Sequence, residues 1–301
     1  MSGRHACALL LVTVAVAVGP GCGPSPAPWA FDTIPEQQFR LEMHDETLVD
    51  DVTVEIERLA DVRLARVGGG DGSETELELF LDRYYLRVTG GPGGETQVAI
   101  SRDAFVSRAA DGTELRLDGD DQTPSALSVA ALLERPLSGT AVDTTGALAR
   151  SSWHAVDPLV QDVEILGWLL LGLPVLSGGD ETWTASREVP KIGSYRLGVE
   201  LPLRFEAAPA AAGAEAGAGT LRHLRLTGFA SRPEITLTDG YAGSIELSLE
   251  GQTRLGSAGD LRKSELVLAM VFESKSGSVI RSRHSVVIAC LDCEGRGQIS
   301  R

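Results

Sequence analysis

The sequence predicts a mainly β protein, built from one or more curved antiparallel sheets with about two helices packed on one face. Hydrophobic and charged residues alternate with period two over most of the chain, which is typical of strands that bury one face and expose the other. Glycine clusters and an Asp-Gly pair separate these segments at short intervals and favour hairpin connections. Hydrophobic residues make up 43% of the composition but aromatic residues only 5%, so we expect a mostly aliphatic core.

The first 22 residues have the three parts of a secretory signal peptide. Arg4 and His5 form a short basic start, residues 8–18 are uniformly apolar, and small residues then lead to Cys22. A membrane-spanning helix needs about 20 apolar residues, and this run is about half as long. We therefore expect residues 1–21 to be a cleaved signal peptide rather than a membrane span or a buried helix.

The end of this segment resembles a bacterial lipoprotein signal, in which a cysteine after a small residue is lipidated and becomes the mature N-terminus. Gly21 and Cys22 match that motif, whereas Gly19 and Pro20 depart from its usual residues. The resemblance implies a lipid anchor at Cys22, and Gly23 in the next position implies the outer membrane, facing the periplasm or the cell surface. Ordinary cleavage and secretion is the alternative.

Residues 22–36 are rich in proline and lack periodicity, which predicts a tether that lifts the following domain off a membrane. Alternation begins at Phe39, and we expect a β-rich domain over residues 37–301. The first strands of this domain are expected at 39–44, 52–57, 62–67, 76–82, 84–88, 97–100, 104–108 and 114–119.

Two segments break the alternation and predict the helices. Residues 124–134 follow Thr123 as a cap, and residues 158–172 follow Asp157. Both segments begin with proline, which suits the first helical position because its missing N–H has no partner there. The second helix is almost wholly apolar, and a helix that is apolar all round is normally buried.

Strands are expected to resume at 181–189, 194–207, 221–229, 234–238, 243–255, 260–274 and 279–289. The pattern G-x-L-x-[R/K]-S occurs at 146–151 and again at 259–264, each time in a turn followed by a strand. This repetition suggests that the domain has two similar halves, which meet near residues 151–175.

The chain has four cysteines, of which Cys7 would leave with the signal peptide and Cys22 would carry lipid. Cys290 and Cys293 remain as an isolated C-x-x-C pair. A small disulfide loop in an oxidising compartment is the favoured interpretation. Zinc binding would need two further ligands at set spacing, and a redox pair would need a following helix.

The formal net charge of −15 argues against two classes of partner. Acidity of this size repels nucleic-acid phosphates and anionic lipid surfaces, and no cluster of Lys and Arg with interleaved aromatic residues offsets it. We therefore expect no nucleic-acid partner. The sequence also indicates no cofactor and no metal site.

The sequence predicts no catalytic residue. His154 lies three residues before Asp157 and would be a candidate general base, but nucleophile motifs such as G-x-S-x-G are absent from the sequence. His44, His223 and His284 lie in alternating segments beside charged or hydroxyl residues, and they are expected to face solvent.

The apolar helix is the one segment with a functional interpretation. Ile165, Trp168, Leu169 and Leu171 either pack as ordinary core or border an apolar cavity that accepts an acyl chain. The first interpretation makes the helix a structural element. The second makes these four residues contacts for an apolar ligand.

The middle of the chain is similar to a group of uncharacterised bacterial envelope lipoproteins. Their phrase Leu-Pro-x-x-Pro-Val-x-x-Gly-Asp-x-Trp is matched, without the second proline and one residue off in spacing, by Leu173, Pro174, Val175, Gly179, Asp180 and Trp183. We therefore expect a non-catalytic envelope lipoprotein that binds an envelope protein or an apolar ligand such as a lipid. An exported enzyme, such as a hydrolase with a site that the sequence does not reveal, is the alternative.

Overall fold

The computed structural model describes residues 36–49, 51–69, 74–91, 94–101, 104–118, 136–143, 148–153, 165–172, 182–189, 197–208, 222–237, 240–256 and 260–293. The expected signal peptide, almost all of the expected tether and the helix expected at 124–134 lie outside these residues. Within them, no helix is both long enough and apolar enough to cross a membrane.

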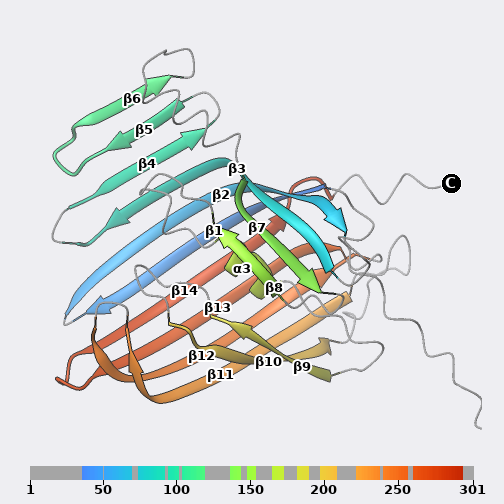
Figure 1. Cartoon of the computed structure of the whole chain (residues 1–301). Helices are drawn as coiled ribbons and strands as arrows, with labels where there is room; N and C mark the ends of the chain where they lie inside the picture. The colour runs from blue at the N-terminus through green and yellow to red at the C-terminus, as the bar shows by residue number, and fades with distance from the viewer. Residues whose placement is uncertain are drawn as a thin grey trace, which may run out of the picture.

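The described residues form one large antiparallel sheet, which is not closed (Figure 1). Twelve strands follow one path in the order β6-β5-β4-β3-β2-β1-β14-β13-β12-β11-β10-β9. The first run comprises β1 (Glu36–Val49), β2 (Val52–Gly69), β3 (Glu74–Thr89), β4 (Thr96–Ser101), β5 (Ala104–Arg108) and β6 (Glu114–Asp118). The second comprises β9 (Thr182–Glu188), β10 (Glu200–Ala208), β11 (Arg222–Thr236), β12 (Ala242–Leu255), β13 (Leu261–Ser274) and β14 (Val279–Cys290).

The two runs of strands are joined by the pairing of β1 with β14. The two strands pair antiparallel from Phe39 opposite Cys290 to Val49 opposite Ile280. Figure 1 shows this junction as the blue strands beside the red ones, in the middle of the sheet. The chain therefore closes its longest sequence separation at the centre of the fold.

One face of the sheet, which we call the inner face, is apolar and buried. Along β1 it carries Phe39, Leu41 and Met43, and all the buried apolar side chains of the neighbouring strands belong to the same cluster. The opposite, outer face carries charged pairs that cross between strands, such as Arg40 with Asp61. This alternation follows from the period-two pattern of the sequence, so the prediction of a mainly β, antiparallel fold is confirmed.

Two further strands leave the main path at β3. The second half of β3 pairs with β4, whereas its first half pairs with β7 (Pro136–Asp143), which in turn pairs with β8 (Leu148–Trp153). In the view of Figure 1, β7 and β8 lie in front of the middle of the sheet.

The expectation of about two helices is not supported. The described residues contain one helix, α3 (Ile165–Gly172), which is the last part of the segment expected at 158–172. α3 packs against β13 and β14 on the inner face. The division of the domain into two similar halves stays a prediction.

Candidate functional site

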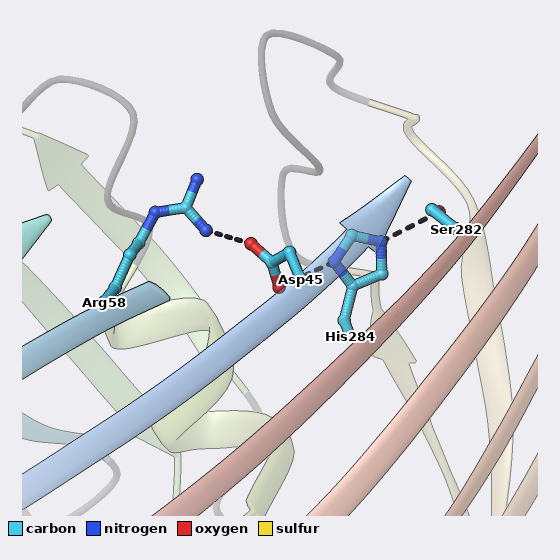
Figure 2. A network of polar contacts seen from close by, with 4 residues as sticks. All are labelled: Asp45, Arg58, Ser282 and His284. Atoms are coloured by element: carbon cyan, nitrogen blue, oxygen red, sulfur yellow. Dashed lines mark hydrogen bonds and ion pairs between the residues drawn. The ribbon is translucent and has the colours of Figure 1, made fainter. Parts of the chain in front are cut away.

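Four polar side chains form a network on the otherwise apolar inner face (Figure 2). His284 lies at its centre. The Nδ1 atom of His284 is 2.8 Å from Oδ1 of Asp45, and its Nε2 atom is 2.9 Å from Oγ of Ser282. The guanidinium of Arg58 donates a hydrogen bond to the other carboxylate oxygen of Asp45. The order along the network is therefore serine, histidine, aspartate and arginine.

The strand register brings these residues together. Asp45 on β1 lies directly opposite His284 on β14, although 239 positions separate them in the sequence. Ser282 precedes His284 by two residues and so lies on the same face of β14. Arg58 lies on β2 opposite Met43, one inner-face position along from Asp45. The network thus spans three adjacent strands at the junction of the two runs.

The network is buried and its charges are compensated. The side chains of Asp45, Arg58 and His284 are only 8%, 10% and 3% exposed. Burial alone would raise the pKa of Asp45, but the hydrogen bond with His284 and the charge of Arg58 outweigh it, so the pKa lies below its ordinary value. Removing one partner of such a buried pair leaves an uncompensated charge, which typically costs about 3–5 kcal/mol.

The tautomer of His284 follows from its two partners. A neutral imidazole that donates from Nδ1 to the carboxylate of Asp45 accepts the hydroxyl proton of Ser282 at Nε2. This is the arrangement that activates a serine nucleophile in hydrolases. Ser282, however, lies within β14, between Thr47 of β1 and Met270 of β13. Its backbone is part of the sheet, and the described residues of these strands offer no free pair of N–H groups to stabilise an oxyanion.

Helix α3 covers this network. The ring centroids of Trp168 and His284 are 6.1 Å apart, with the ring planes tilted by 36°. Trp168, Leu169 and Leu171 are all buried, and Ile165 begins the helix. Whether these residues contact an apolar ligand stays a prediction.

The histidine at the centre of the network corrects one expectation. His284 is buried, whereas the sequence interpretation had it facing solvent. The signal that identifies it is strand parity, because Val286 and Ile288 share its face and belong to the core. His44 is exposed and His223 is half-buried. His154 lies outside the described residues.

The remaining cysteines lie at the end of β14. Cys290 and Cys293 form a disulfide with a Cα–Cα distance of 5.6 Å. One ligand atom from each of Cys290, Asp292 and Cys293 lies within 4.8 Å of the others, but both sulfur atoms are engaged in the disulfide. This cluster is therefore a covalent loop and not a metal centre. Cys22 lies outside the described residues.

Comparisons with known proteins do not place the chain in a family. No family model matches it, and no curated protein matches it. Residues 173–180 of the lipoprotein-like phrase lie outside the described residues, and Trp183 lies in β9.

Three solved structures share parts of the architecture. A structure of lipovitellin, described for its lipid–protein interactions, has a TM-score of 0.43 at 9% identity over 84% of this chain, which spans 25% of that protein. The beta domain of the Bordetella autotransporter BrkA has a TM-score of 0.22 at 10% identity, with 85% and 99% of the two chains covered. A DUF1329 family protein from Desulfovibrio piger has a TM-score of 0.17 at 10% identity, with 88% and 90% covered. All three scores are low, so the function proposed below rests on the side chains of this protein alone.

The depressed pKa of Asp45 predicts a specific acid sensitivity. A carboxyl group with a lowered folded pKa stabilises the fold fully above its ordinary value of 3.8 and loses that contribution as the pH falls through the folded pKa. Asp45→Asn should therefore be about 3–5 kcal/mol less stable than wild type at pH 5, and the gap should narrow by pH 3. Urea unfolding at both pH values measures the gap. Glu46→Gln, on the exposed face of the same strand, should track wild type. A gap for Asp45→Asn that stays constant or widens in acid would contradict the electrostatic role.

Proposed function

We propose that the protein is a non-catalytic envelope lipoprotein that binds an apolar ligand, with an acyl chain held between the inner face of the sheet and α3. This function uses the largest apolar surface of the fold. It also gives a role to α3, which lies on that surface against β13 and β14.

The observation that carries the proposal is the difference in size between the inner face and the helix on it. Neighbouring strands lie about 4.8 Å apart, so a path of twelve strands is roughly 50 Å wide along its curve. A helix of eight residues is only about 12 Å long. Within the described part of the chain, α3 therefore covers a small share of the apolar face. An apolar sheet face must be covered, and an acyl chain is one way to cover it.

The composition of α3 supports the same proposal. Trp168 and Leu169 are adjacent and Leu171 follows half a turn later, so these side chains point in different directions around the helix axis. All three are buried, which means that α3 meets buried surroundings on more than the side that faces the sheet.

The proposal includes a lipid anchor at Cys22, supported by the short apolar run that precedes this residue. Two or more acyl chains on one cysteine would hold the protein stably on a membrane surface. The ligand-binding sheet would then lie close to a source of amphiphilic molecules.

The anchor predicts a simple redistribution. Cys22→Ala should move the protein from the membrane fraction to the soluble fraction of the cell envelope, because the acylated residue is lost. Cell fractionation and the mass of the N-terminal peptide measure this change. An unchanged distribution and an unmodified N-terminal peptide in wild type would contradict the lipid anchor.

The ligand site predicts a small stability loss at α3. If Leu169 borders a ligand site, Leu169→Ala should cost less than about 2 kcal/mol of unfolding free energy and should change the binding of the apolar dye N-phenylnaphthylamine. Urea unfolding and dye titration of the full chain measure both effects. Val271→Ala, at an exposed position of β13, should change neither.

A different pair of results would make α3 plain core. In that case wild type would bind no dye and would not be stabilised by it, and Leu169→Ala would cost about 2–5 kcal/mol through the cavity that it leaves. Those results together would remove the ligand function.

The network of Figure 2 favours a second candidate, an esterase-type hydrolase. Oγ of Ser282 would attack an ester carbonyl while Nε2 of His284 takes the hydroxyl proton and returns it to the leaving alcohol. Water would then cleave the acyl-serine, and Asp45 would hold the imidazole in place throughout.

A fluorophosphonate probe separates the two functions, because it phosphonylates only an activated serine. The binding function predicts no labelling at Ser282, since this residue is buried within the sheet. Labelling of wild type that is lost in Ser282→Ala, but kept in the exposed-position control Ser248→Ala, would establish the hydrolase instead.

A further inference from the structure

Gln37 on β1 is a buried amide without a partner. Its residue is 0% exposed, and neither Nε2 nor Oε1 of its side chain has a hydrogen-bond partner in the described structure. It shares the inner face with Phe39 on its own strand and lies opposite Leu64 on β2, both of which are buried and apolar. A donor and an acceptor are thus held, unsatisfied, in apolar surroundings.

Such groups call for an explanation. Buried polar atoms in native proteins are almost always paired with protein, water or a ligand, because an unpaired donor or acceptor has lost its water without replacement. The other polar side chains that β1 contributes to the inner face do not share this problem, since Asp45 is bonded to both His284 and Arg58. The unmet hydrogen bonding on this strand is therefore confined to Gln37.

The placement of Gln37 gives the inner face a direction. Gln37 and Asp45 are eight residues apart on one strand, which corresponds to about 27 Å. Between them this face carries Phe39, Leu41 and Met43, all buried and apolar. A ligand that satisfies Gln37 with a polar group at one end would lay an apolar chain along these three residues.

The charges nearby define the polar group. Phe39 and Leu64 carry no charge that could compensate an anionic head. The carboxylate of Asp292 accepts a hydrogen bond from the backbone N–H of Gln38, the next residue, and would repel an anion. An amide offers both a donor and an acceptor, so it suits a neutral hydroxyl or ester group.

We infer that Gln37 binds the neutral head group of a single-chain amphiphile, such as a monoacylglycerol, whose acyl chain lies on the inner face of β1. This inference rests on the proposed function and adds the class of ligand and the residue that selects it. The selectivity comes from one side chain whose hydrogen bonds are completed only when the ligand is present.

The test compares Gln37→Leu with wild type in displacement of N-phenylnaphthylamine from the full chain. Monolauroylglycerol should bind about 10-fold more weakly to the variant, because its head group loses its hydrogen-bond partners. Dodecane, which has no head group, should displace the dye equally from both proteins. The urea midpoint of the unliganded variant should be unchanged or higher, because an unpaired amide has been replaced by an apolar side chain.

The control is Gln38→Leu, which changes an exposed side chain on the outer face of the same strand and should alter none of these values. Gln37→Met is a second variant with an unbranched side chain, and it should behave as Gln37→Leu does.

Each contrary outcome is distinct. Equal affinity of wild type and both Gln37 variants for monolauroylglycerol would overturn the role of Gln37 while leaving the apolar site intact. A large fall in the urea midpoint of both variants would also overturn it, by showing that the amide has a structural partner. Failure of wild type to bind the dye would overturn the proposed function and this inference together.

Discussion

The pairing of β1 with β14 is the constraint on which the rest of the structure depends. It joins two runs of six strands into one sheet, and it does so between residues near opposite ends of the chain. A slip of one residue in this register would turn Phe39, Leu41 and Met43 to the outer face. The bond between Asp45 and His284 disfavours such a slip, because both side chains would lose their buried partners. The polar network thus supports the register from within the apolar face.

The strands were accessible from the sequence because period-two alternation is a local signal. The segments expected at 39–44, 52–57 and 76–82 lie within β1, β2 and β3, and those expected at 243–255 and 279–289 nearly coincide with β12 and β14. The same parity, extended one step beyond the apolar residues, would have placed Asp45 beside Met43 and His284 beside Val286. Polar neighbours in the sequence, such as Arg283 and Ser285, instead suggested a solvent-facing histidine.

The partners of these residues were not accessible in the same way. Nothing local indicates that Asp45 lies opposite His284, because strand order and register are set by contacts across more than two hundred residues. The helix content was wrong for a related reason. Caps and prolines mark where a helix can begin, but packing on the sheet decides how much of it forms, and of the described part of 158–172 only Ile165–Gly172 is helical.

The inner face combines a satisfied polar network, an apolar strip and an unsatisfied amide along one strand. These three features have different consequences, because a network with every partner in place stabilises the fold and needs no ligand. Gln37 lacks such partners, and the strip between it and Asp45 is apolar. The sheet is therefore a scaffold whose central strands carry both the element that fixes its register and the surface that we assign to a ligand.

The most direct measurement of this assignment is by NMR, using carbon-13-labelled acyl chains and methyl-labelled protein. If the inner face holds the chain, nuclear Overhauser contacts should join the acyl methylenes to methyl groups of Leu41, Met43 and Val286. Contacts confined to exposed apolar residues, such as Val271 and Leu115, would show adventitious binding elsewhere and contradict the account.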